Sequence, residues 1–402
     1  MTCKNKPKKI ENYKESELVF CSFSPVGLDD YATYFINNFD KFVYLKWKFP
    51  HSRGISEITK YRKKEVISKR KLLSLPVFSN KFLYFLFLPL NYLIYFFQSL
   101  SVIWKRNSDS RIFFGINYFC TFCGIILKKF DRVDFVIYRV MDFFPLPPSG
   151  PYRILNRVFY KIDKFCLENA DSIWFTTEGH LVGREKYKYF DRSKHNYQII
   201  PLGLDINKFI SCPVDDENRY SLVYCGVISK YHLLDLLFDV MCDLRKDFKN
   251  IKLNLIGSGP DEDYFKDLSK KMNLQDNIVF HGFMNDGENF RNLMSHNILG
   301  IALYKDEENF MKYTEPAKVK YYLSFGVPAI ISDVPKIAKE LDEKRVSFAV
   351  SNNKEEIVAV VKKFIENKQL QQEYKENIKE FVRSVDVNSL LKNTFSNTFE
   401  GR

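Results

Sequence analysis

Lys318 stands in a segment whose residue types fit the anion-binding end of a helix. Pro316 suits a first turn because its missing N–H costs nothing there, and Gly326 is placed to end the helix in a left-handed conformation. The free N–H groups of a first turn favour an anion, and a lysine adds positive charge to them. Residues 327–331 then predict a short buried parallel strand. Such a segment could hold a diphosphate, although a solvated lysine in an ordinary helix–strand unit explains it equally well.

Asp142 occupies the corresponding position of interest in the first half of the chain. It follows the predicted strand 135–140, and open α/β sheets bind ligands outside the carboxyl ends of their strands. A carboxylate there could accept the proton of a hydroxyl group in a transition state. A helix cap or a solvated loop residue is the alternative explanation for the same aspartate.

Further candidates follow predicted strands of the second half. A glycine at such a place lets the backbone approach a ligand closely, but ordinary strand–helix turns also use Gly-x-Gly. Tyr304 could instead be a partly exposed aromatic residue at a strand end, and His281 could be a structural histidine. These candidates are Gly226, the triplet Gly257, Ser258 and Gly259, His281 and Tyr304.

The elements that must position these residues alternate between strands and helices. In the first half, apolar runs predict strands at 18–23, 42–45, 111–116 and 135–140, with helices between them. In the second half, strands at 221–226, 252–256, 278–280 and 299–303 alternate with helices. This alternation predicts an α/β fold with two doubly wound parallel sheets.

The segment around Lys318 resembles the nucleotide-sugar-binding segment of the GT-B glycosyltransferases of the group 1 and family 4-like set. Their pattern is Pro-x-Lys-x-x-Glu-Tyr-x-x-x-Gly-x-Pro, and this chain matches it at Pro316, Lys318, Tyr322, Gly326 and Pro328. The chain departs from the pattern at Tyr321, where many relatives carry a glutamate that bonds the nucleotide ribose.

A second resemblance is to the family of the xanthan β-glucuronosyltransferase. Residues 113–116, Phe-Phe-Gly-Ile, precede an apolar helix, and residues 136–142, Val-Ile-Tyr-Arg-Val-Met-Asp, look like the Val-Tyr-Arg-x-x-Asp of that family. This resemblance implies that Asp142 is the catalytic base. It also implies a nucleotide contact for Tyr304, which follows a similar Gly-Ile-Ala at 300–302.

The resemblances imply a GT-B architecture of two Rossmann-like domains with a cleft between them. Residues 198–205 are similar to the Ile-Pro-Asn-Gly-Val-Asp that ends the first domain in group 1 enzymes. We expect a flexible basic N-terminus at 1–16, an acceptor-binding domain at 17–205 and a nucleotide-sugar-binding domain at 206–385. The tail at 386–402 would cross back to the first domain.

The implied reaction moves a sugar, as in a hexosyltransferase, from a nucleotide-diphosphate sugar to a glycan or a lipid-linked glycan, as in polysaccharide biosynthesis. Lys318 would hold the diphosphate, and Gly226, Gly257, Ser258, Gly259, His281, Tyr304 and Glu315 complete the predicted donor site. A base at Asp142, opposite the leaving group, would invert the anomeric centre. A UDP-sugar is the favoured donor.

Two alternatives stay open at this point. Glu307 and Glu315 have the spacing of the Glu-x₇-Glu in retaining family 4 enzymes, but Glu315 lies eleven residues before Gly326, and Tyr321 stands where the second glutamate is expected. Retention by the same fold is therefore one alternative. The other is a GT-B domain that binds a nucleotide or glycan without catalysis, because the glutamate at 321 is missing.

The positive charge is concentrated in the first half. The chain carries 61 Lys and Arg residues and 49 Asp and Glu residues. Residues 1–205 hold 33 of the basic and 19 of the acidic residues, which gives this part a net charge of +14, and the remaining residues have a net charge of −2. We find no nucleic-acid-binding motif. An anionic membrane surface is the favoured partner, because basic residues are attracted to it. We expect a cytoplasmic protein that is peripheral on the inner face of a membrane.

Residues 82–104 contain no charged side chain and are rich in Phe, Tyr, Leu and Ile. They are long enough to span a bilayer. However, strands are predicted before and after this segment, and a membrane crossing would place strands of one sheet on opposite sides of the membrane. A buried helix of the first domain and a helix resting in the membrane interface both remain open.

The cysteines predict no metal site. Cys120 and Cys123 form the one Cys-x-x-Cys pair, but they lie in an apolar helical run without a second pair. We expect reduced, buried thiols and a reaction that uses neither a metal ion nor another cofactor.

Overall fold

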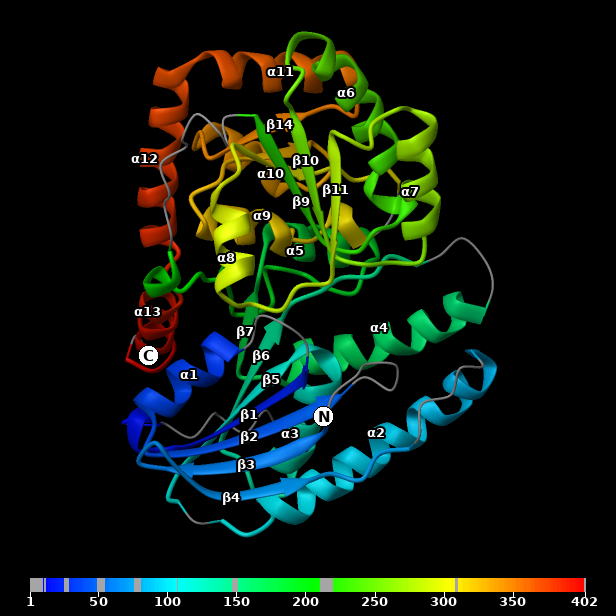
Figure 1. Ribbon diagram of the computed structural model, residues 1–402. Helices are drawn as coiled ribbons and strands as arrows, with labels where there is room; N and C mark the ends of the chain where they lie inside the picture. The colour runs from blue at the N-terminus through cyan, green and yellow to red at the C-terminus, as the bar shows by residue number, and fades with distance from the viewer. Residues whose placement is uncertain are drawn as a thin grey trace. The chain divides into compact units, whose positions relative to one another are not determined.

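The computed structural model describes residues 10, 12–24, 29–48, 55–75, 81–106, 108–146, 151–209, 220–307 and 310–400. Most of the predicted flexible N-terminus, residues 1–9 and 11, lies outside these ranges, as do residues 147–150 of a proline-rich loop. The chain divides into two compact units, one of residues 1–200 with 388–402 and one of residues 201–387. Each unit holds one sheet (Figure 1).

The first unit contains an eight-stranded sheet in the order β4-β3-β2-β1-β5-β6-β7-β8. From β2 to β8 all neighbouring strands are parallel, and β3 and β4 extend the edge as an antiparallel pair. The strands are β1 (Glu17–Ser24), β2 (Lys41–Lys48), β3 (Glu57–Arg62), β4 (Glu65–Lys71), β5 (Arg111–Ile116), β6 (Phe135–Val140), β7 (Ser172–Phe175) and β8 (Tyr197–Ile199).

The β3–β4 hairpin was not predicted from the sequence. Its turn is formed by Lys63 and Lys64, whose φ angles are 49° and 72°. Two-residue hairpins with positive φ normally use Asn-Gly or similar pairs, so two lysines give no turn signal. Every residue of β4 is exposed, and its run of basic residues hides the alternation that marks a strand.

Helices cover both faces of the first sheet. On one face, the core joins strand residues such as Val19 and Val136 to residues of α2 (Lys81–Ile103), α3 (Asn117–Lys129) and α4 (Pro151–Asn169). On the other face, Phe20 and Phe114 pack against Phe35 of α1 (Asp29–Asn38). Phe114 also contacts Phe395 of α13 (Val387–Phe399), so the end of the chain completes this unit. A further helix is α5 (Glu178–Lys186).

α2 is partly buried against the first sheet, as the first of the two explanations predicted, and the structure does not test the second, a helix in the membrane interface. Asn91, Tyr95, Ser99 and Ile103 are buried at four-residue intervals, whereas other apolar side chains of the same helix are exposed. The helix lies along the sheet (Figure 1), to which Trp47 Nε1 connects it by donating to Ser99 Oγ at 3.1 Å. Among the described residues, no helix is long and apolar enough to cross a membrane.

The second unit contains a fully parallel six-stranded sheet in the order β11-β10-β9-β12-β13-β14. Its strands are β9 (Ser221–Cys225), β10 (Lys252–Ile256), β11 (Ile278–Gly282), β12 (Leu299–Ala302), β13 (Ala329–Ser332) and β14 (Ser347–Val350). Its helices are α6 (Leu234–Asp247), α7 (Glu262–Lys271), α8 (Glu288–Ser295), α9 (Ala317–Ser324), α10 (Ile337–Glu343), α11 (Lys354–Glu366) and α12 (Lys368–Ser384).

The strand order places a switch point between β9 and β12. The chain builds β10 and β11 on one side of β9 and then returns to the other side for β12. Loops that leave two adjacent strands in opposite directions open a crevice at their carboxyl ends, where such sheets bind ligands. Both predicted doubly wound parallel sheets are therefore confirmed, and the second has its crevice at the loops after β9 and β12.

Candidate functional site

Lys318, the second residue of α9, lies at the switch point of the second unit. Its Nζ is 4.3 Å from the centroid of the Tyr224 ring and 5.3 Å from that of Tyr304. Nδ1 of His232 is 3.5 Å from the same nitrogen. No carboxylate of the described residues contacts it, and burial lowers the pKa of Lys318 to about 7. The lysine is half-buried, so it is desolvated without an anionic partner.

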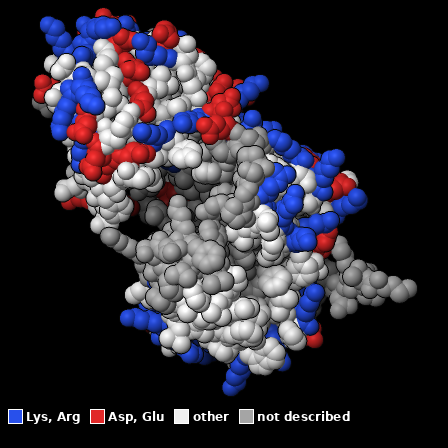
Figure 2. Space-filling view, turned by 90° about the vertical axis from the view of Figure 1, so that its right-hand side faces the viewer, with Lys and Arg blue, Asp and Glu red and all other residues white. Residues whose placement is uncertain are grey.

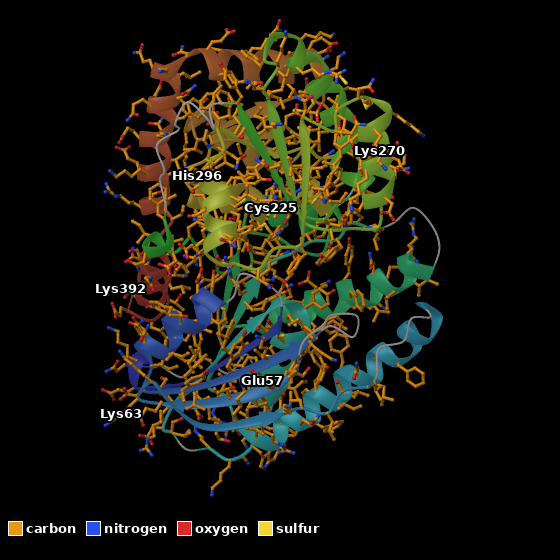
Figure 3. The ribbon with its side chains drawn as sticks, viewed as in Figure 1. Glu57, Lys63, Cys225, Lys270, His296 and Lys392 are labelled. Carbon is orange, nitrogen blue, oxygen red and sulfur yellow. The ribbon has the colours of Figure 1, made fainter. Side chains whose placement is uncertain are left out.

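Tyr322, the tyrosine of the matched motif, holds α9 against the sheet. Its hydroxyl accepts a hydrogen bond from the Cys225 N–H at 2.9 Å and donates one to the Ile301 carbonyl at 2.9 Å. A side chain at Gly300 would meet the Tyr322 ring at 2.4 Å. The tyrosine is thus a positioning residue that fixes Lys318 relative to β9 and β12. Figure 3 labels Cys225 at the end of β9.

The predicted glycines create the close approach of two loops. A Cβ at Gly257, where φ is +136°, would lie 1.9 Å from the Gly226 carbonyl oxygen. A Cβ at Gly259 would lie 2.1 Å from the Ile228 carbonyl oxygen, and Ile228 N–H donates to the Ser258 carbonyl. Only glycine permits this packing. Gly226 itself, at φ +153°, leaves the space in front of Lys318 open, since a Cβ added there would lie 3.4 Å from Nζ.

Tyr304 belongs to the same cluster as Lys318. It is 1% exposed, and its hydroxyl has no hydrogen-bond partner within the described ranges. Burial raises its pKa. Its backbone is fixed from both sides, because its N–H donates to Ser332 Oγ and its carbonyl accepts from Asn352 Nδ2.

Glu315 and His281 lie in different surroundings. The Glu315 carboxylate is buried, pairs with Lys320 Nζ at 3.0 Å and accepts the Leu202 N–H at 2.8 Å, so it fixes the loop that precedes α9. His281 is half-buried at the end of β11, with Nε2 2.8 Å from Asn254 Oδ1, and burial lowers its pKa. Within the part of the chain that the structure describes, neither of them has a hydrogen bond, ion pair or ring contact with Lys318.

Asp142 lies just beyond the end of β6 in the first unit, as the sequence predicted. Its Oδ2 accepts a hydrogen bond from Asn117 Nδ2 at 2.9 Å, while Asn117 Oδ1 accepts the Met141 N–H at 2.9 Å. Asn117 adopts a φ of +56°, which asparagine tolerates better than most residues. Burial raises the pKa of Asp142, and the hydrogen bond from Asn117 and the charge of Arg184 oppose this rise.

A buried polar network supports the backbone around Asp142. Arg184 forms an ion pair with Asp163 at 2.9 Å and donates to the Asp142 carbonyl at 3.3 Å. Asp163 also accepts hydrogen bonds from the hydroxyls of Tyr138 and Tyr189. Arg184 and Asp163 are therefore paired with each other, whereas no ion pair joins Asp142 to another of the described residues.

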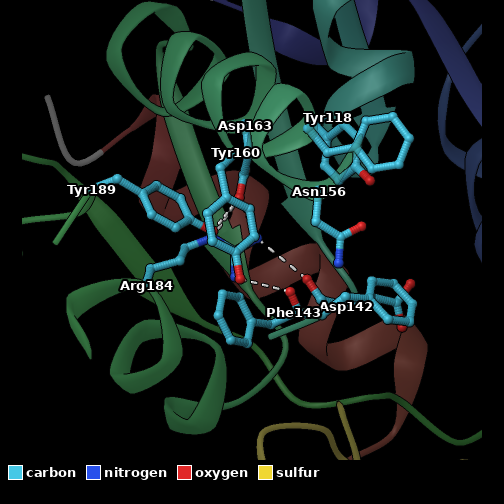
Figure 4. A pocket seen from close by; sticks show the side chains of 10 residues that line it. Tyr118, Asp142, Phe143, Asn156, Tyr160, Asp163, Arg184 and Tyr189 are labelled. Carbon is cyan, nitrogen blue, oxygen red and sulfur yellow. Dashed lines mark hydrogen bonds and ion pairs between the residues drawn. The ribbon is translucent and has the colours of Figure 1, made fainter. Parts of the chain in front are cut away.

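Asp142 lines a small pocket with about 270 Å³ of empty space that opens to solvent. Figure 4 shows Asp142 and Asn156 next to Tyr118 on one side and Arg184 and Tyr189 on the other. The remaining lining residues are mainly aromatic: Phe143, Phe144, Phe159 and Tyr160, with Asp163 beneath them. Aromatic faces combined with carboxylate and amide groups suit a ligand that has both apolar faces and hydroxyl groups.

Three residues of these clusters were not among the predicted sites. Asn117 carries a signal that could have been used, since an asparagine directly after a strand and before a helix is typical of a special backbone conformation. Tyr224 was predicted only as part of a strand. His232 was one of several histidines without distinguishing context, because its position beside Lys318 of α9 depends on a contact between residues 86 positions apart.

Within the ranges that the structure covers, no group of three or more His, Cys, Asp or Glu side chains could hold a metal ion. Cys120 and Cys123 are buried in α3, and burial raises the pKa of Cys123. They do not extend the site.

Comparisons with known proteins agree with this architecture. The family model described as "Glycosyl transferases group 1" matches residues 207–381. No curated protein matches the chain. Among solved structures, HepE of Anabaena, crystallised with UDP, has a TM-score of 0.68 and 13% identity, covering 96% of this chain and 100% of its own. HepE has also been crystallised with UDP-glucose.

Two further structures have the same fold. The sucrose-phosphate synthase of Thermosynechococcus elongatus has a TM-score of 0.70 and 12% identity, covering 96% of this chain and 100% of its own. WaaG, described as a glycosyltransferase involved in lipopolysaccharide biosynthesis, has a TM-score of 0.62 and 14% identity, covering 94% and 98%. The chain therefore has the GT-B fold, and the group 1 match over most of its second unit supports a glycosyltransferase.

Proposed function

We propose that this protein transfers a sugar from a nucleoside-diphosphate sugar to a glycan or lipid-linked glycan acceptor with inversion of the anomeric centre. The observation that carries the proposal is Lys318, a half-buried ammonium group at the switch point of the second sheet that contacts no carboxylate of the described residues. A cation in this state lacks compensation that an anion would supply. The complexes of HepE with UDP and UDP-glucose favour a uridine nucleotide.

The leaving group in this scheme is the nucleoside diphosphate. As the bond between the anomeric carbon and the phosphate oxygen breaks, negative charge develops on that oxygen. Lys318 stabilises this charge, aided by the free N–H groups at the start of α9. The crowded loops at Gly226 and Gly257 bring backbone close to the same place. The charge of Lys318 takes the part that a metal ion plays in other transferases.

The acceptor half of the scheme is assigned to Asp142. The acceptor hydroxyl loses its proton to the carboxylate while its oxygen attacks the anomeric carbon from the face opposite the diphosphate. Asn117 occupies Oδ2 and leaves Oδ1 for the substrate. The aromatic lining of the adjacent pocket suits the apolar face of a sugar ring.

A nucleotide screen tests the donor half. Thermal shift and calorimetry with UDP, GDP, ADP and CMP are compared between the wild type and Lys318→Ala. We expect one nucleoside diphosphate to stabilise the wild type and to bind the variant about 10- to 150-fold more weakly, as for the loss of a charged hydrogen bond. Equal binding by both proteins would contradict the placement of the diphosphate at Lys318.

The acceptor half is tested by the product. Incubation with the sugar nucleotide of the preferred base and a lipid-linked glycan should yield a product of inverted configuration, and Asp142→Asn should slow its formation by about 10²- to 10⁴-fold. Retained configuration would favour the retaining alternative. Nucleotide binding without product from any sugar nucleotide would favour a binding protein without catalysis. This is the second candidate function, because Tyr321 replaces the glutamate of the family pattern.

We propose further that the first unit rests on an anionic membrane that presents the acceptor. The feature behind this proposal is the inverted polarity of α2. Its buried positions Asn91, Tyr95 and Ser99 hydrogen-bond to Leu75 N–H, Ser56 and Trp47. Its exposed positions include large apolar side chains, Leu90, Leu93 and Phe97, and Trp104 directly follows the helix; their exposed fractions are 42–60%. Water leaves such a stripe uncovered, whereas a membrane interface covers it.

Basic residues surround this apolar stripe. β4 is exposed along its length and carries Lys69, Arg70 and Lys71, and Lys105 follows α2. Lys60 of β3 donates to the Val102 carbonyl of α2 at 3.4 Å, which keeps the hairpin beside the helix. The lower part of Figure 2 shows a broad uncharged area edged by Lys and Arg. Each such residue near an anionic surface contributes about 1 kcal/mol.

Co-sedimentation with vesicles tests this placement. The wild type should bind vesicles of phosphatidylcholine and phosphatidylglycerol at low salt, and more weakly at high salt. The double substitution Leu93→Ser and Phe97→Ser should reduce binding strongly. Phe283→Ser is the control, because Phe283 is an aromatic residue of the second unit that is even more exposed, at 74% against 60% for Phe97. Absence of wild-type binding at low salt would refute the membrane part alone.

A further inference from the structure

Lys318 and His232 form a pair of basic side chains in direct contact. Nζ of Lys318 is 3.5 Å from Nδ1 of His232, at hydrogen-bonding distance. Such a bond needs a donor and a free lone pair. When both groups are protonated, neither facing nitrogen has a lone pair, and the two charges repel. This contact is therefore most favourable when the pair holds at most one positive charge.

The groups that face this pair offer no negative charge. They are Tyr224 and Cys225 of β9, Tyr304 after β12 and Tyr322 of α9. Burial raises the pKa of each of these four groups, so all are neutral near pH 7. No Asp or Glu among the described residues contacts Lys318 or His232. The surroundings therefore favour a singly charged or neutral pair while no ligand is bound.

The imidazole is held in position to face the lysine. The His232 ring packs 5.9 Å from the Tyr224 ring and 5.8 Å from the Tyr304 ring. Burial and the neighbouring Lys318 lower the pKa of His232 to about 3, so the free imidazole is neutral. The buried Tyr304 hydroxyl in the same cluster lacks a hydrogen-bond partner within the described ranges. The amine of Lys318, the imidazole of His232 and the hydroxyl of Tyr304 thus lie close together, and no anionic group of the described residues accepts hydrogen bonds from them.

We propose that the Lys318–His232 pair takes up protons when a diphosphate binds, so that His232 becomes a second cationic ligand beside Lys318. This inference rests on the proposed function, because it concerns the same donor site. The oxygens of a diphosphate can accept hydrogen bonds from Lys318 and His232 at the same time. Both side chains can then be protonated, because neither has to accept a hydrogen bond from the other. Protons come from solvent, and donor affinity falls as pH rises.

Calorimetric titration with UDP in buffers of different ionisation enthalpy measures the protons taken up. The wild type is compared with His232→Gln, which keeps a donor but does not titrate, and with Lys318→Arg, which stays charged. The terminal phosphate of UDP titrates near neutral pH in every titration, so differences between proteins at the same pH carry the information. Tyr231→Ala is the control for the loop, since Tyr231 is exposed next to His232.

The two side chains are expected to act at different pH. Near about pH 8 most Lys318 is neutral before binding, so the wild type should take up more protons than Lys318→Arg by about one. Near about pH 6 Lys318 is already charged, and the excess of the wild type over His232→Gln reports the imidazole. The Kd of the wild type should rise up to about tenfold per pH unit for each proton taken up.

Two results would overturn the inference. Equal proton uptake by the wild type and His232→Gln at both pH values, with UDP bound to both, would show that the imidazole stays neutral. Equal uptake by the wild type and Lys318→Arg near about pH 8 would show that Lys318 takes up no proton on binding. Either result leaves the proposed function intact, because UDP still binds. Failure of every nucleoside diphosphate to bind would instead remove the proposed function and this inference together.

Discussion

Two lysines of α9 differ sharply in their surroundings although they are two positions apart. Lys318 has aromatic rings and a histidine around it, whereas Lys320 is buried in an ion pair with Glu315 at 3.0 Å. Burial of an uncompensated ammonium group costs stability, whereas a buried ion pair loses stability when one partner is removed. The first arrangement is typical of a binding site and the second of a structural element.

Lys318→Met should therefore leave the free protein as stable as the wild type or more stable, and remove nucleotide binding. Lys320→Met should destabilise the second unit by about 3–5 kcal/mol, because the Glu315 carboxylate is left buried without its partner. Denaturant titration and nucleotide binding distinguish the two variants. A marked destabilisation by Lys318→Met would mean that Lys318 serves the fold and not a ligand.

Burial disfavours the ionised form of Asp142, an arrangement that is common at functional sites. Its folded-state pKa is raised by burial above the unfolded value. The stability that the protonated carboxyl contributes is fully present below the unfolded pKa and is lost as pH rises through the folded pKa. At neutral pH the ionised Asp142 carboxylate is therefore unfavourable for the stability of the folded first unit, so stability does not explain why an aspartate stands at this position.

Asp142→Asn should accordingly stabilise the first unit at neutral pH, with a difference that shrinks as pH falls below the folded pKa. The same variant should lose about 10²- to 10⁴-fold in transfer rate, the usual contribution of a general base. Equilibrium denaturation at several pH values and a product assay check both effects. A variant that is less stable at neutral pH would identify Asp142 as a structural residue.

At the scale of elements, the donor site depends on two loops that touch through glycines. Gly257→Ala would force a Cβ to within 1.9 Å of the Gly226 carbonyl oxygen, in a backbone conformation that alanine rarely adopts. We expect a strongly destabilised second unit and weaker nucleotide binding, since the loops must separate. Gly287→Ala is the matched control, because its nearest neighbour is 3.9 Å away and its φ of −148° suits alanine. Melting curves with and without UDP compare the two, and equal melting temperatures would contradict the predicted crowding.

The same scale shows what the sequence could predict. The helix at Lys318 was predictable because its start, buried stripe and end each have a local signal, and Gly326 does adopt a φ of +69°. Asp142 was predictable at a strand end. The β3–β4 hairpin and the contact of His232 with Lys318 were not. The first lacks turn residues, and the second arises only when the segment after β9 and the start of α9, which are far apart in the sequence, meet in the folded unit.

At the scale of the whole molecule, the first unit is completed by the end of the chain. Phe395 of α13 is fully buried and packs 5.1 Å from the Trp174 ring and 6.2 Å from the Phe114 ring. The sheet face that carries Phe20 and Phe114 would otherwise be open on the side of α13. Residues 388–402 therefore contribute to the stability of a unit that is otherwise built from residues 1–200.

The three tryptophans make this dependence measurable. Trp47, Trp104 and Trp174 all belong to the first unit, so their fluorescence reports its unfolding and not that of the second unit. Phe395→Ala removes a buried aromatic ring and should lower the stability of the first unit by about 3–5 kcal/mol. The fluorescence-detected transition should shift to lower denaturant, while stabilisation by UDP, which acts on the second unit, should persist. Phe283→Ala, at an exposed position, should leave the fluorescence transition unchanged. If Phe395→Ala left it unchanged as well, the C-terminal helix would not be part of the folded first unit, and the division of the chain into these two units would be wrong.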